Sequence, residues 1–156
     1  MGPKNKIMIK ELANASKVMI DTAPLVYFIE EHEKYLDILS DTFSKIDSGE
    51  KTGITSIVTL IEVLVKPLKD NNQKLVNEYQ SILTASRNIL LVDITQNIGK
   101  KAAELRAKYN ILLPDAIQIA VGIMNDADIF LTNDELLKKV TEINVVVLEE
   151  IIGIHN

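Results

Sequence analysis

Short apolar runs alternate with longer segments of helical periodicity along this chain of 156 residues, and this alternation limits the fold more than any other feature. Runs rich in Val, Ile and Leu have the length of buried strands, and the intervals between them are long enough for helices. These runs span residues 18–21, 53–55, 89–92, 128–132 and 144–148. The pattern predicts an α/β domain with a mainly parallel central sheet that helices cover on both faces.

Apolar residues at helical spacing predict where those helices lie. The most regular pattern occupies residues 56–66, and we expect Pro67 to end or kink this helix. Its apolar stripe consists of Ile57, Leu60, Ile61, Leu64 and Val65, continued by Leu68. Further helices are predicted at residues 25–30, 33–47, 73–87, 96–108, 114–124 and 134–140, and residues 7–15 have a helical pattern as well.

The composition is that of one folded domain, with 47% hydrophobic and 25% charged residues. The chain has no cysteine, which excludes disulfides, thiolate zinc sites and cysteine nucleophiles. No apolar run approaches the roughly 20 residues that span a bilayer, so we expect a cytoplasmic protein without a membrane segment. The net charge of −5 argues against a nucleic-acid partner, but four metal-bound carboxylates would leave the protein nearly neutral.

Four acids stand where a parallel sheet collects its ligands, outside the carboxyl ends of the strands. Asp21 and Asp134 directly follow predicted strands, Glu62 lies early in the helix after the second strand, and Asp115 follows Pro114 in the first turn of another helix. Each acid alone is explained as a helix cap, a helix-start residue or a boundary residue. Together, however, all four are expected to converge on one rim.

Four converging carboxylates repel one another strongly unless a cation compensates them. The chain has only two arginines, Arg87 and Arg106, so the natural compensator is a hard divalent cation with oxygen ligands. We therefore expect one or two Mg²⁺ or Mn²⁺ ions at this rim. Zinc is disfavoured because the only histidines, His32 and His155, fall outside the group of acids.

Four sequence blocks around these acids resemble the motifs of PIN-domain nucleases, the family that includes VapC-type toxins. The first block, residues 18–30, reads VMIDTAPLVYFIE, and the second, residues 55–64, reads TSIVTLIEVL. The third, residues 113–120, reads LPDAIQIA, and the fourth, residues 130–134, reads FLTND. The blocks occur in the family's order, and the similarity runs from about residue 17 to residue 150.

The resemblance implies an α/β/α sandwich that cleaves phosphodiester bonds with a divalent metal, usually in RNA, and that often forms homodimers. Carried over position by position, Asp21, Glu62, Asp115 and Asp134 become the catalytic and metal-binding residues of an endoribonuclease, with Thr132 as a supporting polar group. A toxin of this type would also need an antitoxin protein as partner. Residues 1–16 precede the usual family start, so we expect an N-terminal extension followed by a PIN-like domain at residues 17–156.

Other functions fit the sequence less well than a nuclease does. A phosphotransferase with Asp21 as nucleophile needs a second acid two residues later, where Ala23 stands. The paired acids and late lysine of a phosphoacceptor regulatory module are absent, and so are the glycine-rich motifs that bind phosphates. A catalytically degenerate scaffold or binding module remains the alternative. Candidate contacts to RNA phosphates are Lys66, Lys69, Lys100, Lys101, Arg106, Lys108, Lys138 and Lys139.

Overall fold

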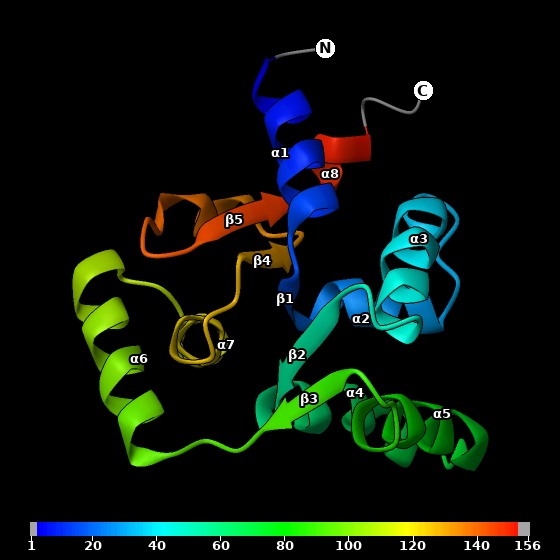
Figure 1. The fold of residues 1–156 in the computed structure, drawn as a ribbon. Helices are drawn as coiled ribbons and strands as arrows, with labels where there is room; N and C mark the ends of the chain where they lie inside the picture. Colours follow the sequence, from blue (N-terminus) through cyan, green and yellow to red (C-terminus); the bar gives the residue numbers. More distant parts are fainter. Residues whose placement is uncertain (1–2, 153–156) are drawn as a thin grey trace.

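A five-stranded sheet in which every strand pair is parallel forms the centre of the computed structural model, which describes residues 3–152 (Figure 1). The strand order is β3-β2-β1-β4-β5. The strands are β1 (Lys17–Ile20), β2 (Thr52–Ser56), β3 (Ile89–Val92), β4 (Ile129–Thr132) and β5 (Asn144–Val147). Each predicted apolar run overlaps one of them, so the predicted α/β fold with a parallel sheet is confirmed.

Helices cover both faces of this sheet, which makes the molecule a three-layer sandwich (Figure 1). One face packs against α6 (Gln96–Tyr109) and α7 (Leu113–Met124). The opposite face packs against α2 (Thr22–Ile29), α3 (Leu36–Asp47), α4 (Ile57–Lys69) and α5 (Gln73–Thr84). Successive side chains of β1 point to opposite faces of the sheet, so Val18 and Ile20 belong to one apolar cluster and Met19 belongs to the other.

The N-terminal helix α1 (Pro3–Asn14) packs against β5 and the short helix α8 (Leu148–Ile152) near the end of the chain. The buried Lys51 anchors it, because the Lys51 ammonium donates to the carbonyls of Leu12 at 2.8 Å, Ala13 at 3.1 Å and Ala15 at 2.5 Å. Residues 1–2 of the predicted extension and residues 153–156 lie outside the described part. Within residues 3–152, no helix is both long and apolar enough to cross a membrane.

Several predicted helix boundaries differ from the structure. Helix α4 does not end at Lys66 but continues to Lys69, with Pro67 inside its last turn, where a missing N–H costs a single hydrogen bond. The segment predicted as a helix at residues 134–140 is the 3₁₀ helix η1 (Glu135–Lys139). Helix α2 begins at Thr22, three residues earlier than predicted, because the side chain of Asp21 caps it directly after β1. Helix α3 begins later than predicted and α5 ends earlier.

Only part of the most regular apolar stripe of the sequence packs on the core, where Leu60 and Leu64 contact the buried residues. On α4, Ile61 is 59% exposed, Val65 46% and Leu68 55%. The residues that this helix buries instead are Thr59, Val63 and Pro67. One side of α4 therefore presents an apolar surface to solvent.

Candidate active site

Asp21 stands at the carboxyl edge of the sheet, between β1 and α2. Its backbone N–H continues the sheet by donating to the Leu131 carbonyl at 2.9 Å, and its side chain caps α2. In this cap, Oδ1 accepts a 2.8 Å hydrogen bond from the backbone N–H of Thr22. The carboxylate is thereby held at the strand end where the sequence predicts it.

Thr22 joins Asp21 to Glu62. Its backbone N–H binds Asp21, and its hydroxyl donates to Glu62 Oε1 at 3.0 Å. Glu62 lies on α4 and is an exposed residue. A single residue therefore brings together two of the predicted acids, which lie 41 positions apart in the sequence, one just before α2 and the other on α4.

Thr132, the predicted supporting residue, joins Asp21 to Asp134 on the other side. Its buried hydroxyl donates to Asp21 Oδ2 at 2.8 Å and accepts from the backbone N–H of Asp134 at 3.1 Å. Asp134 caps η1 by accepting from the Leu136 N–H at 2.9 Å. Three of the predicted acids thus belong to one hydrogen-bonded group at the sheet edge.

Asp115 is close enough to the other three acids for their charges to affect its pKa. It lies in the first turn of α7, where burial raises the pKa of its carboxyl to about 6, helped by the charges of Asp21, Asp134 and Glu62. Burial is also the main reason why the pKa of Asp21 is raised, and hydrogen bonds from Thr132 and Thr22 oppose this rise. The structure brings all four predicted acids near one another.

No basic side chain that the structure describes forms an ion pair with these acids. The ion pairs within residues 3–152 all lie elsewhere, and none includes Asp21, Glu62, Asp115 or Asp134. In the same part of the chain, no three acidic or histidine side chains form a complete ligand set for one ion. The described part of the chain therefore leaves the charges of these acids without an ion-pair partner.

The sequence did not predict the cluster of buried polar side chains that lies beside the acids. The Gln118 side chain accepts a short hydrogen bond from the Ser56 hydroxyl and donates to the hydroxyls of Thr59 and Thr22, the last at 3.4 Å. Gln118, Ser56 and Thr59 are all buried. The signal that marks this group in the sequence is a glutamine in the middle of the apolar helix AIQIAV, at residues 116–121.

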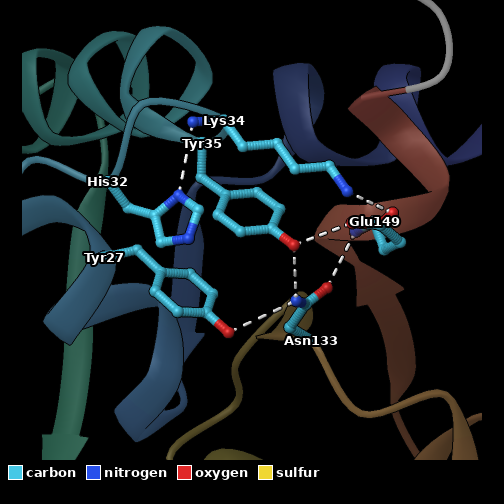
Figure 2. Close-up of polar contacts among 6 residues, drawn as sticks. All are labelled: Tyr27, His32, Lys34, Tyr35, Asn133 and Glu149. Carbon is cyan, nitrogen blue, oxygen red and sulfur yellow. Dashed lines mark hydrogen bonds and ion pairs between the residues drawn. The ribbon is translucent and has the colours of Figure 1, made fainter.

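Asn133 fixes the segment between Thr132 and Asp134 to its surroundings (Figure 2). Its amide nitrogen donates to the hydroxyls of Tyr35 at 3.1 Å and Tyr27 at 3.4 Å. Its oxygen accepts from the Glu149 N–H at 2.8 Å, and Tyr35 donates to the Glu149 carboxylate at 2.7 Å. The site is therefore tied to both the α2–α3 connection and α8.

The histidines lie outside the acidic group, as far as the structure describes them. His32 packs against the rings of Tyr27 and Tyr35, and its Nδ1 accepts from the Lys34 N–H at 3.3 Å (Figure 2). His155 lies outside the described residues.

Half of the basic residues considered for phosphate binding have partners within the chain. Arg106 donates to the Ile111 carbonyl at 3.1 Å, so it fixes the connection between α6 and α7. Lys101, Lys108 and Lys138 form ion pairs with Glu104, Glu142 and Glu150. The candidates without an ion pair to any described residue are Lys66, Lys69, Lys100 and Lys139.

The sequence model of the PIN domain matches residues 18–143, which cover all four acids. The chain belongs to the PIN domain family. Members of this family are nucleases, so the chain falls among the hydrolases that act on nucleic acids. No curated protein matches the chain.

Solved structures of similar fold come from toxin–antitoxin complexes. A chain of VapBC2 from Rickettsia felis, bound to a DNA fragment from its promoter, matches with a TM-score of 0.65 and 18% identity, covering 83% of this chain and 96% of that one. A chain of a Klebsiella pneumoniae toxin–antitoxin complex matches at 0.62 and 19%, covering 85% and 98%. DNA-bound VapBC from Salmonella typhimurium gives 0.64 and 15%, covering 85% and 98%. At these identities the similarity establishes the fold alone.

Proposed function

We propose that this PIN-domain protein is a cytoplasmic endoribonuclease that depends on Mg²⁺ or Mn²⁺, with Asp21, Glu62, Asp115 and Asp134 as its catalytic and metal-binding residues. The observation that carries the proposal is the environment of Asp115, whose pKa is raised to about 6 by burial and by the three other carboxylates. No described Lys or Arg pairs with the group. A hard divalent cation is the partner that such oxygens select.

The donor set fits this class of metal because every candidate ligand is a carboxylate oxygen. Asp21 and Asp115 are the proposed direct ligands, and Glu62 and Asp134 complete a site for one or two ions directly or through water. Mg²⁺ usually keeps several waters and is held by one or two carboxylates, so a ready-made set of three protein ligands is not needed. When bound, the metal lowers the pKa of a water and stabilises charge on the attacked phosphate. Thr22 and Thr132 hold the carboxylates in position.

A cleavage assay on a mixed RNA pool tests this proposal, with Mn²⁺ in the presence and absence of a chelator. Asp21→Asn is expected to lower cleavage by more than about 100-fold while the protein stays folded, since loss of outer-shell partners alone costs up to about that factor. Asp70→Asn is the matched control, because Asp70 is exposed at the far end of α4. Full activity of Asp21→Asn would refute the assignment.

The competing function is a catalytically degenerate PIN-like scaffold or binding module. The presence of acids at all four motif positions weighs against it, because a scaffold has no use for mutually repelling carboxylates. Absence of chelator-sensitive cleavage across a range of pH and metal conditions would favour the scaffold.

A protein antitoxin is the proposed regulatory partner. The complexes of similar fold described above motivate this role, and a cavity of about 480 Å³ with a mixed polar and apolar lining lies beside α2, α3 and α5, where a partner segment could bind. Its apolar lining includes Phe28, Phe43, Ile82 and Ile89. Expression of the gene alone is expected to arrest growth, and Asp21→Asn is expected to relieve the arrest. Normal growth with the wild-type gene would contradict a toxin.

A second copy of the chain is the other proposed partner. The exposed apolar side of α4, formed by Ile61, Val65 and Leu68, supports a homodimer. Sedimentation is expected to give a dimer for the wild type and a monomer for Val65→Asp. A monomeric wild type at high protein concentration would contradict the dimer.

A further inference from the structure

Gln118 is a buried polar residue in an otherwise apolar helix, and no step of the proposed reaction yet uses it. Its side chain is 1% exposed, and its partners Ser56 and Thr59 are fully buried. A buried amide without partners costs about 1–3 kcal/mol, so its hydrogen bonds must compensate it. They lead from the interior of the sandwich to the acids at the sheet edge.

The inner end of this chain of hydrogen bonds has a fixed direction. The backbone N–H of Val58 can only donate, and it donates to Ser56 Oγ at 3.1 Å. The Ser56 hydroxyl then gives its own proton to Gln118 Oε1, which can only accept. The amide of Gln118 is therefore oriented with its N–H₂ group toward the acids.

The outer end has the same direction. A carboxylate oxygen accepts, so Thr22 donates its single hydroxyl proton to Glu62 Oε1 at 3.0 Å. The 2.9 Å contact between the Thr22 and Thr59 hydroxyls then requires Thr59 as donor. Thr59 in turn accepts from the N–H₂ group of Gln118. The Val58 N–H at one end and the Glu62 carboxylate at the other therefore determine the donor and the acceptor of every hydrogen bond between them.

The opposite orientation of the Gln118 amide leaves groups without partners. With the amide oxygen toward Thr59, the Thr59 proton would go to Gln118, and no proton would remain for the contact between Thr59 and Thr22. The Ser56 hydroxyl would face an N–H₂ group and a backbone N–H, both donors, so its own proton would have no acceptor among these groups. Only the first orientation satisfies all of the buried groups.

We propose that Gln118 is a positioning residue that sets the direction of a hydrogen-bond chain through Thr59 and Thr22 to Glu62. These hydrogen bonds hold Glu62 Oε1 in place and leave Oε2 for the divalent cation of the active site. This inference rests on the proposed function, because it assigns Gln118 a role in presenting one of that function's metal ligands. Thr22 links the same chain to Asp21, through the backbone N–H that binds Asp21 Oδ1.

Substitutions that change hydrogen bonding at nearly constant volume test this role. Thr59→Val removes the central hydroxyl, whereas Thr59→Ser keeps it. Gln118→Met removes the amide, and Gln118→Glu removes the N–H donors while keeping the shape. The four variants and the wild type are compared by the binding of Mn²⁺ without RNA, measured calorimetrically, by their melting temperatures, and by the Mn²⁺ concentration that gives half-maximal RNA cleavage.

We expect the Mn²⁺ dissociation constant to rise about 10-fold in Thr59→Val, Gln118→Met and Gln118→Glu, the usual size of effects from residues that orient a ligand. Thr59→Ser is expected to stay within about threefold of the wild type, as a conservative rescue. The Mn²⁺ requirement for cleavage should shift by the same factor, while the rate at saturating Mn²⁺ changes much less. A residue that only supports the fold would lower the melting temperature without this separation.

Folded Thr59→Val with wild-type affinity for Mn²⁺ would overturn the inference, and this variant decides the question if Gln118→Met does not fold. If the wild type cleaves RNA and the variants bind Mn²⁺ with wild-type affinity, the role of Gln118 is refuted and the proposed function is not. A wild type that binds Mn²⁺ through Asp21 but cleaves no RNA refutes the proposed function, and the shift in Thr59→Val would still support the role of Gln118. A wild type that binds no Mn²⁺ overturns both.

Discussion

Asp115→Asn is expected to stabilise the metal-free protein near pH 7.5, although it removes a residue of the proposed active site. The pKa of Asp115 is raised from 3.8 to about 6, so its charged form is disfavoured in the folded protein relative to the unfolded chain. The folded state binds more protons between these two values, and stability therefore falls as pH rises from about 4 to about 6. Above about pH 6 the charged carboxyl of Asp115 lowers the free energy of unfolding by its full amount.

The size of this effect follows from the shift. About two pKa units correspond to about 3 kcal/mol, which solvent screening reduces to about 1–2 kcal/mol because Asp115 is partly exposed. Loss of an acid at the helix N-terminus removes about 0.3–1 kcal/mol of this gain. The net gain of about 1 kcal/mol raises the melting temperature by about 2–4 °C.

The assay is thermal unfolding with a chelator at pH 7.5 and at pH 4, where the raised pKa leaves Asp115 mostly protonated. The gain should be present at pH 7.5 and absent at pH 4, and Mn²⁺ should raise the melting temperature of the wild type more than that of the variant. Asp37→Asn is the matched control, because Asp37 occupies the first turn of α3 and should lose stability when neutralised. Destabilisation by Asp115→Asn at pH 7.5, or an equal gain at both pH values, would refute the reasoning.

Three further predictions concern the N-terminal helix, the segment beside the site and the contacts to RNA. We propose that residues 1–16 are an extension of the domain of residues 17–156, and that Lys51 holds its helix α1 in place. Lys51→Met should lower the free energy of unfolding by about 1–3 kcal/mol in urea and expose α1 to proteases, and an unchanged urea midpoint would contradict this. Asn133→Ala should cost about 0.5–1.5 kcal/mol, measured in the same way, because the Glu149 N–H loses its acceptor at an exposed position. RNA affinity should fall with salt with a logarithmic slope of about −0.7 for each phosphate contacted, and a flat response would argue against backbone contacts by Lys66, Lys69, Lys100 and Lys139.

The sequence predicts the sheet and the placement of the acids because both depend on local patterns. Asp21 and Asp134 directly follow apolar runs, and the carboxyl ends of parallel strands lie at one edge whatever the order of the strands. Asp115 is placed by Pro114, which begins a helix well. The sequence could therefore place the acids at one edge of the sheet even though it did not reveal the order of the strands.

Features that depend on contacts between distant segments were not predictable in this way. The apolar stripe of α4 shows that Ile61, Val65 and Leu68 share a face, but periodicity does not tell which face meets the sheet. Gln118 reaches Ser56 and Thr59 across about 60 positions of sequence, and only its place in an apolar helix hints at a partner. Its role depends on the direction of hydrogen bonds, which only the folded structure defines.

Diffraction from crystals soaked with Mn²⁺ tests the central claim most directly, because the anomalous signal locates the metal. The account predicts one or two peaks at the carboxyl edge of the sheet, within about 2.0–2.5 Å of oxygens of Asp21 and Asp115, and no peak there in Asp21→Asn. Chelator-sensitive RNA cleavage by a protein whose crystals bind Mn²⁺ elsewhere, with no peak beside these acids, would contradict it.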